Sequence, residues 1–297
     1  MALSGFPLAE AARPPAAPET ARPRNGTSVD SPVRGRGWAS NSGFRIMHSR
    51  QPPESEMLHR SRRFPVPFDL LSEAVAWRYR PAGRFAQGFV RGKLRYDPVY
   101  RHLFEADLPR AEGVVLDLGC GRGIALTLLA TGRSLGLGCG GSGPALRWVG
   151  IERRAAHAAA AGVALGDEAE ILTQDVLTAA FPRARLVLLI DVLLYLGRAE
   201  QDRVLERAAA ALTDGGRLII READAAAGWR YRATVSAERL SAWRRGEWRQ
   251  AYHYRSQADW LQRLAELGLR VTTHPMSDGT PFANILFIAE CATALGG

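Results

Sequence analysis

The stretch Val114-Val115-Leu116-Asp117-Leu118-Gly119-Cys120-Gly121-Arg122-Gly123 decides how the rest of the chain is interpreted. Its apolar first half predicts a buried strand, and its glycines predict a sharp turn because they tolerate backbone angles that other residues avoid. Residues 124–130 are typical of a helix that begins directly after the turn. A strand, a glycine turn and a helix leave free backbone N–H groups at the start of the helix. The stretch therefore predicts a ligand site, with Asp117 at the carboxyl end of the strand.

The glycine spacing separates two kinds of nucleotide site. The dinucleotide fingerprint G-x-G-x-x-G would require glycine at position 124, where Ile124 stands, and this argues against a dehydrogenase. A literal G-x-G-x-x-G does occur at Gly136, Gly138 and Gly141. No apolar strand precedes it, so we expect a flexible loop over residues 131–143.

The V-L-D-L-G-C-G-x-G arrangement of residues 115–123 resembles motif I of the class I S-adenosylmethionine-dependent methyltransferases of the bacterial small-molecule type. The resemblance implies an α/β fold, a Rossmann-like doubly wound seven-stranded sheet that is mostly parallel with an antiparallel last strand. It also implies that the cofactor S-adenosyl-L-methionine lies against the turn. The residues implied to bind it here are Asp117, Gly119, Cys120, Gly121 and Gly123, with Asp117 meeting the ammonium and the helix start favouring the carboxylate.

A second predicted strand, residues 146–152, ends in an acid, Glu152. A carboxylate there can accept hydrogen bonds from both ribose hydroxyls, and Arg153 beside it is a further candidate for the cofactor site. The alternative is an ordinary surface charge at a strand end. The separation from the glycine turn exceeds the roughly 20 residues that are usual for such an acid, because the Gly-rich segment intervenes.

Two more strands are predicted to end at the same edge of the sheet. In residues 169–177 a short strand runs into Asp175, where the resemblance implies a contact with the adenine amino group, with Val176 against the ring; the alternative is a turn cap. Residues 184–190 run into Asp191 and look like the I-D-V-L-H-Y-L pattern of this class, with Leu194 where a histidine often stands. Ligands of open α/β sheets bind beyond the carboxyl ends of the strands, so one pocket should collect these residues.

The C-terminal half adds a fifth strand, residues 217–224, and two last strands, residues 269–274 and 284–289. Residues 225–256 form a predicted insert on the substrate side, rich in aromatic and arginine side chains. Such side chains suit a flat or anionic acceptor and also suit stacking on nucleic-acid bases. Alternatively, Leu240 and Trp243 pack inward while the arginines stay in water. A hydroxyl acceptor would need a base, for which His253 and Tyr195 are the candidates.

Composition divides the 297 residues into two parts. Residues 1–64 are rich in Pro, Arg and Ala, carry ten arginines against five acids and show no helical or strand period, which predicts a disordered tail. Translation starting at Met47 or Met57 is an alternative. Residues 65–297 form the predicted methyltransferase domain, with residues 65–110 as a helical cap. Lys93 is the only lysine, and every other residue of the 39 Lys and Arg is arginine.

The sequence also excludes some environments. No run reaches the roughly 18 apolar residues of a membrane span, and the N-terminus lacks a secretory signal pattern. Cys120, Cys139 and Cys291 have no metal-ligand spacing, so we expect no metal site and a cytoplasmic protein. The oligomeric state is not predicted.

Together these features predict methyl transfer to a small-molecule acceptor, in particular O-methylation of an aryl or polyketide-like compound. One alternative is an RNA methyltransferase that uses the basic tail and the insert. No Asn/Asp-Pro-Pro-Tyr/Phe follows the fourth strand, as methylation of exocyclic amino groups would suggest. A second alternative is a protein that binds the cofactor without catalysis.

Overall fold

The structure is a computed structural model that describes residues 68–105, 112–137, 146–244 and 246–291. These residues all belong to one compact unit, residues 54–297. The predicted tail, both alternative start sites and Cys139 lie outside the described residues. None of the described helices is both long and apolar enough to cross a membrane.

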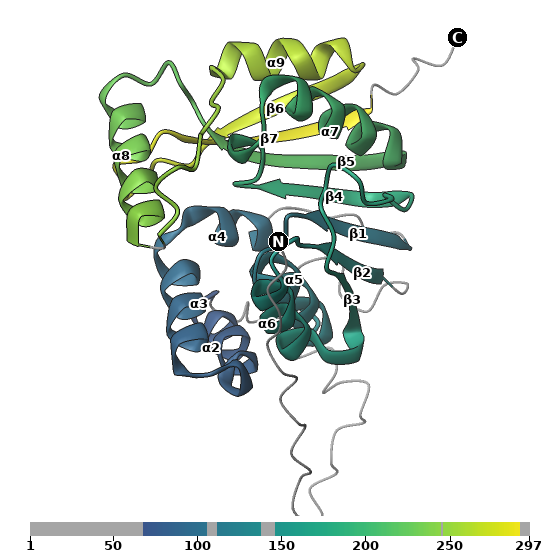
Figure 1. Ribbon diagram of the computed structural model, residues 1–297. Helices are drawn as coiled ribbons and strands as arrows, with labels where there is room; N and C mark the ends of the chain where they lie inside the picture. The colour runs from purple at the N-terminus through teal and green to yellow at the C-terminus, as the bar shows by residue number, and fades with distance from the viewer. Residues whose placement is uncertain (1–67, 106–111, 138–145, 245, 292–297) are drawn as a thin grey trace, which may run out of the picture. The chain divides into compact units, whose positions relative to one another are not determined.

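A seven-stranded sheet is the centre of this unit (Figure 1). Its strand order is β3-β2-β1-β4-β5-β7-β6, and β7 alone among them runs antiparallel to its neighbours. The predicted fold class is therefore confirmed. The strands are β1 Gly113–Leu118, β2 Leu146–Ile151, β3 Ala169–Leu172, β4 Ala184–Ile190, β5 Leu212–Ala223, β6 Leu269–Pro275 and β7 Asn284–Cys291.

Helices cover both faces of the sheet, and two separate apolar cores lie beneath them. The central strand β4 shows why: Leu186 and Leu188 point into one core, while Val187 and Leu189 point into the other. Side chains of a strand alternate between faces, so an uninterrupted apolar run can serve both. The helices are α2 Phe68–Arg78, α3 Arg84–Tyr96, α4 Pro98–Glu105, α5 Ile124–Ser134, α6 Ala155–Leu165, α7 Arg198–Ala211, α8 Trp229–Arg244 and α9 Gln257–Glu266.

Two predicted boundaries are wrong. The helix after the glycine turn continues to Ser134, into the segment predicted as a loop. The fifth strand begins at Leu212 rather than Arg217 and contains Gly215 and Gly216, and its pairing with β4 shifts register between Ala184 and Leu186. Pairing along β4 evidently outweighs the local turn preference of the two glycines, as the context dependence of strand formation allows.

The helices α3 and α8 lie beyond the end of the sheet where β4 finishes (Figure 1). Asp97 follows α3 and accepts a hydrogen bond from the backbone N–H of Val99 at 3.3 Å, in the first turn of α4. Pro98 opens α4, where a missing N–H costs nothing because the first N–H groups of a helix have no partner within it. Segments far apart in the chain thus meet over the carboxyl ends of the central strands.

Candidate functional site

The glycine turn after β1 is held close to its neighbours. The N–H groups of Gly119 and Cys120 both donate to the carbonyl oxygen of Ile151, at 2.7 and 3.0 Å. Gly119 has a positive φ of 73°, and a Cβ built on it would lie 2.6 Å from a methyl carbon of Val192. Gly121 also has a positive φ, 56°, but a Cβ there would meet nothing within 4 Å. The turn therefore packs against the end of β4 on one side and leaves open space at Gly121.

Asp117 is a buried carboxyl beside this turn. Burial, and then the nearby charge of Glu152, raise its pKa to about 7. Its side chain accepts no hydrogen bond from the residues that the structure describes, although a buried carboxylate normally has such partners. A cation placed beside Asp117 would supply the missing partner and lower its pKa again.

Glu152 lies directly after β2 and is buried. Its two oxygens accept hydrogen bonds from the backbone N–H groups of Gly121, at 2.9 Å, and Arg154, at 2.7 Å. The side chain therefore joins the second strand to the open part of the glycine turn. A carboxylate offers about four acceptor positions, so two backbone bonds leave room for a hydroxylated ligand. Arg153 is exposed next to it.

The two residues predicted to contact adenine, Asp175 and Val176, differ in their burial and partners. Asp175 is half-buried and accepts a hydrogen bond from the N–H of Leu177 at 2.9 Å, which is the turn-capping role considered as an alternative. Val176 is buried in the apolar core on one face of the sheet. Both residues follow β3, the strand next to β2. A contact with adenine stays a prediction for this pair.

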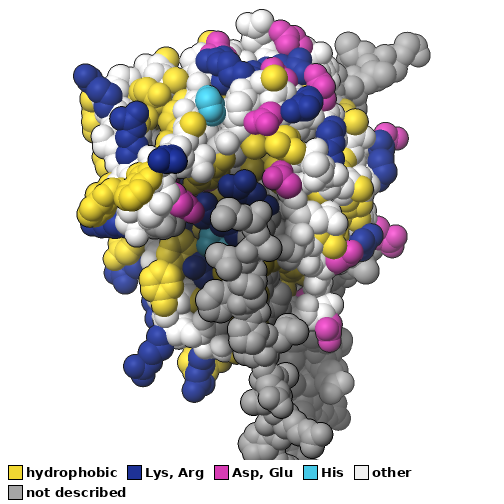
Figure 2. Space-filling model, in the orientation of Figure 1, with side chains coloured by type: hydrophobic (Ala, Val, Ile, Leu, Met, Phe, Trp, Pro, Cys, Tyr) yellow, Lys and Arg dark blue, Asp and Glu magenta, His cyan; other side chains and the backbone are white. Residues whose placement is uncertain are grey.

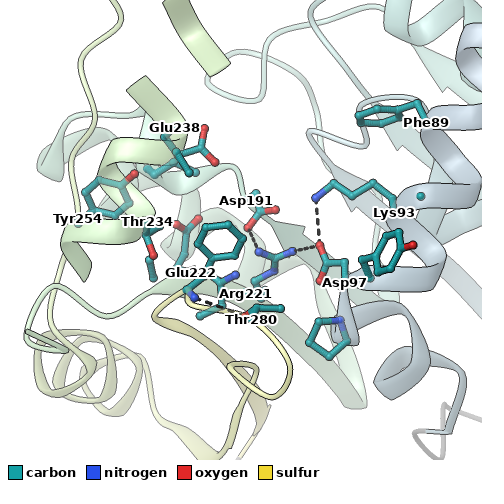
Figure 3. Close-up of a pocket in the computed structure, with 18 of the residues that line it drawn as sticks. Phe89, Lys93, Asp97, Asp191, Arg221, Glu222, Thr234, Glu238, Tyr254 and Thr280 are labelled. Atoms are coloured by element: carbon teal, nitrogen blue, oxygen red, sulfur yellow. Dashed lines mark hydrogen bonds and ion pairs between the residues drawn. The ribbon is translucent and has the colours of Figure 1, made fainter. Parts of the chain in front are cut away.

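Asp191 adopts a left-handed backbone conformation, with φ of 57°, and is the only described residue other than glycine that does so. Its carboxylate lies 2.8 Å from one end of the Arg221 guanidinium, and the other end lies 2.5 Å from Asp97. Asp97 also pairs with the ammonium of Lys93 at 3.0 Å. A chain of four charges thus connects β4, β5 and the α3–α4 junction (Figure 3).

Burial and neighbouring charges set the pKa values in this chain. Burial raises the pKa of Asp191 more than Arg221 and Lys93 lower it. The pKa of Asp97 falls, because the attraction of Arg221 and Lys93 outweighs the large opposing effect of burial. Arg221 is thus the shared partner that keeps two carboxylates at this edge of the sheet.

A cavity of about 430 Å³ opens beside these charges (Figure 3). Its walls come from α3, the ends of β4 and β5, α8 and the start of β7, so they combine aromatic and apolar surface with charged groups. The lining side chains include Phe89, Lys93, Asp97, Asp191, Leu194, Arg221, Glu222, Thr234, Glu238, Tyr254 and Phe282. Mixed apolar walls with a few polar groups are typical of a small-molecule site.

Neither predicted base lies among the residues that line this cavity. The side chain of His253 is exposed, and its backbone N–H donates to the carbonyl oxygen of Leu194 at 2.8 Å. The ring of Tyr195 packs against Tyr252, with centroids 5.7 Å apart. The structure therefore gives His253 a backbone role, and it does not bring the two predicted residues to the charged end of the cavity.

Apart from Asp191, the sequence analysis did not identify the charged residues of the cavity, which are Lys93, Asp97, Arg221, Glu222 and Glu238. The signals were present: Arg221 and Glu222 interrupt an apolar strand, and Lys93 is the only lysine of the chain. A charged pair inside a buried strand requires partners, which the sequence alone does not identify.

The alternative reading of the insert, in which Leu240 and Trp243 pack inward, is wrong. Leu240 is 48% exposed and Trp243 is 64% exposed. Hydrophobic and basic side chains gather over α8 on the surface (Figure 2). The side of α8 that lines the cavity carries Thr234 and Glu238 instead.

This geometry agrees with the comparisons to known proteins. A family model described as a methyltransferase domain matches residues 87–274. The chain therefore belongs to the methyltransferase-domain family, whose methyl donor is S-adenosylmethionine. The described residues fit that donor, since Asp117 is a buried carboxyl without a partner and Gly121 faces open space.

Many solved structures share the fold. The mitomycin 7-O-methyltransferase MmcR is 21% identical with a TM-score of 0.52, over 80% of this chain and 67% of that one. The pyocyanin biosynthetic protein PhzM is 16% identical with a TM-score of 0.51, over 69% of this chain and 58% of that one. This chain thus spans little more than half of PhzM.

A putative methyltransferase from Haloferax volcanii, solved in complex with the activator Trm112, is 15% identical. Its TM-score is 0.52, over 70% of this chain and 94% of that one. At these identities the likeness concerns the fold. A search of curated protein sequences finds no significant match.

Proposed function

We propose that the protein transfers the methyl group of S-adenosylmethionine to a hydroxyl of a small aryl or polyketide-like acceptor held in the 430 Å³ cavity. The observation that carries this proposal is the position of the cavity. It begins at Asp191, and the next residue, Val192, is the one that the glycine turn packs against. Donor and acceptor sites would therefore share the end of β4.

For methyl transfer, the main task of the protein is to align the donor with the acceptor. The sulfonium of the donor supplies an activated methyl group, and holding two reactants in line can contribute about 7–11 kcal/mol. Phe89, Tyr254 and Phe282 provide aromatic surface in the cavity for a flat acceptor. Such surface suits ring compounds, which bury a large apolar area in definite geometry.

Incubation of the purified protein with deuteriomethyl donor and small-molecule extracts tests the proposal. Mass spectrometry should find a product that carries the heavy methyl group, and fragmentation should place that group on oxygen. Donor binding without any labelled small molecule would contradict the proposed activity. A heavy methyl group on RNA in the same mixture would favour the alternative acceptor.

The RNA alternative has one structural observation in its favour. Trp243, Arg244, Trp248 and Arg249 are all exposed near the end of α8, in a combination that suits stacking on bases and contact with phosphates. A steep fall in tRNA affinity with rising salt would support it. Equal affinity at low and high salt would count against it.

Replacing Glu152 by glutamine should weaken donor binding by more than roughly tenfold. The proposed hydrogen bonds from the ribose hydroxyls to a charged acceptor contribute about 1.5–3 kcal/mol each, and about 1.4 kcal/mol corresponds to a factor of ten. Calorimetry with S-adenosylmethionine measures the effect. The matched control is Glu170→Gln, because Glu170 is a half-exposed acid on β3 paired with Arg147. Equal dissociation constants for the two variants would contradict the assignment.

The affinity for the donor should depend on pH through Asp117. Its pKa is about 7 in the free protein, so this carboxyl is mostly protonated at pH 5.5. A bound ammonium favours the charged form, so binding at low pH must release a proton. We expect the affinity to fall by about tenfold between pH 7 and pH 5.5.

Calorimetry in two buffers with different ionisation heats would detect the released proton directly. The Asp117→Asn variant should bind weakly at both pH values, with no proton released. A wild-type affinity that stays constant over this range would remove Asp117 from the ammonium site.

A further inference from the structure

Glu222 is a buried carboxyl that faces the cavity. It is the residue before the end of β5, is 2% exposed and belongs to the cavity wall. Its Oε1 accepts hydrogen bonds from the N–H groups of Val192, at 3.2 Å, and Leu193, at 2.7 Å. The backbone N–H of Leu194 also interacts with this carboxyl, and no side chain of the described residues donates a hydrogen bond to it. The backbone of residues 192–194 therefore fixes the carboxyl at the cavity wall. A carboxylate offers about four acceptor positions, so three backbone N–H groups leave room for a ligand hydroxyl.

Charged and titratable groups approach Glu222 from each element around it. Asp191 follows β4, Arg221 precedes it on β5, Glu238 lies on α8, and Tyr254 lies in the segment before α9. Lys93 and Asp97 complete the charged wall on the other side. Burial, and then the negative charge of Asp191, raise the pKa of Glu222 to about 8, against the opposing effects of the backbone N–H groups and Arg221.

Two other acids of the cavity, Asp191 and Asp97, are less suited to take a proton. Arg221 holds both Asp191 and Asp97, and Lys93 adds a second cation to Asp97. The hydroxyl of Tyr254 is buried and makes no hydrogen bond within the described residues, so it can donate one to an acceptor oxygen. Its pKa is raised by burial and by Glu238 and Glu222, which keeps it protonated.

We propose that Glu222 is the general base that removes the proton from the acceptor hydroxyl. The acceptor oxygen would then lie in the cavity between the carboxyl groups of Glu222 and Asp191. The inference rests on the function proposed above. The proton of the hydroxyl moves to the Glu222 carboxylate as the oxygen forms a bond to the methyl carbon. The carbon–sulfur bond breaks, its electron pair stays on sulfur to give S-adenosylhomocysteine, and Glu222 later returns its proton to water.

A purely structural role for Glu222 makes different predictions. In that role the side chain only holds Val192 and Leu193 at the start of the short helix η4, Leu193–Tyr195. Glutamine keeps an oxygen for those two N–H groups but cannot accept the hydroxyl proton. The variant Glu222→Gln thus separates the two roles. A matched control is Glu200→Gln, since Glu200 similarly accepts from the N–H of Gly197 at the start of α7, outside the cavity wall.

Thermal denaturation as a function of pH tests the titration without an acceptor. A carboxyl whose pKa rises from 4.5 to about 8 on folding stabilises the folded state fully below pH 4.5, and this contribution is lost as pH rises through 8. The melting temperature of the wild type should therefore fall relative to Glu222→Gln between pH 5 and pH 8. Asp117 titrates in both proteins and cancels in the difference. A difference that does not change with pH would overturn the proposal.

Two phenols test the proton transfer itself. At pH 8, 1-naphthol stays mostly protonated, whereas 4-nitrophenol is mostly ionised and needs no base. We expect Glu222→Gln to lower turnover of 1-naphthol by about 10²–10⁴-fold, with little effect on 4-nitrophenol and on the dissociation constant of S-adenosylmethionine. Glu200→Gln should match the wild type with both phenols.

The outcomes distinguish the base from the function on which it rests. Equal turnover of 1-naphthol by the wild type and Glu222→Gln would overturn the base alone. Equal losses with both phenols would indicate a structural role and also overturn it. A wild-type protein that binds the donor but methylates neither phenol would contradict the proposed acceptor class, and the base would fall with it.

Discussion

Replacement of Arg221 by methionine should lower the free energy of unfolding by about 3–5 kcal/mol, the cost of breaking a buried ion pair from one side. Arg221 is 4% exposed and bridges Asp97 and Asp191. Without it, two carboxylates remain in a buried site with only the Lys93 ammonium nearby. Chemical denaturation measures the loss, and the pKa values of both acids should rise.

The control for this variant is Arg91→Met. Arg91 forms an ion pair of similar quality, 2.8 Å from Glu73, but both side chains are about half exposed. Exposed pairs contribute little because water solvates the separated charges well, so its denaturation midpoint should stay that of the wild type. Adding Asp97→Asn to Arg221→Met should restore part of the loss. Equal effects of Arg221→Met and Arg91→Met would contradict the charge chain as a stabilising feature.

The second large effect should come from Gly119→Ala, which we expect to destabilise the fold by about 2–5 kcal/mol. A positive φ costs a residue with a Cβ about 1–2 kcal/mol, and forcing a methyl group into a packed site costs about 1–3 kcal/mol more. The new Cβ would lie 2.6 Å from Val192, far inside contact distance. Denaturation of the free protein measures this cost.

Gly121→Ala is the matched comparison, because it shares the positive φ but has open space around the new methyl group. It should cost about 1–2 kcal/mol of stability, yet weaken the binding of S-adenosylmethionine strongly if the donor occupies that space. The pair thus separates packing of the turn from contact with the ligand. A Gly121→Ala variant with wild-type affinity would move the donor away from the turn.

The sheet and the glycine turn could be predicted because their signals are local. The strands β1 and β4 each carry a run of apolar residues, and each candidate cofactor residue stands within a few positions of a strand end. The structure keeps Glu152 beside Gly121 by a direct hydrogen bond, which the strand order explains, since β2 is adjacent to β1. The order of the strands in the sheet therefore explains why residues predicted from separate strand ends lie close together.

The cavity could not be predicted in the same way. Asp97 and Arg221 are 124 residues apart in the sequence. They form an ion pair because the C-terminal end of α3 lies beside the C-terminal end of β5. In the sequence, His253 is a candidate base because it stands among aromatic and basic residues. In the structure, its backbone N–H is hydrogen-bonded to Leu194 and its side chain is exposed to solvent. Glu222 interrupts an apolar strand, which indicates that it needs partners but does not identify the cavity that it faces.

The single lysine allows the cavity to be labelled selectively. Because every other basic side chain of the Lys and Arg set is arginine, a reagent selective for primary amines has one side-chain target, Lys93, besides the chain's α-amino group. Its side chain is 35% exposed and belongs to the cavity wall. A fluorophore or isotope tag can thus be attached beside the acceptor without engineering a new residue, and two resonances would account for the whole labelled protein.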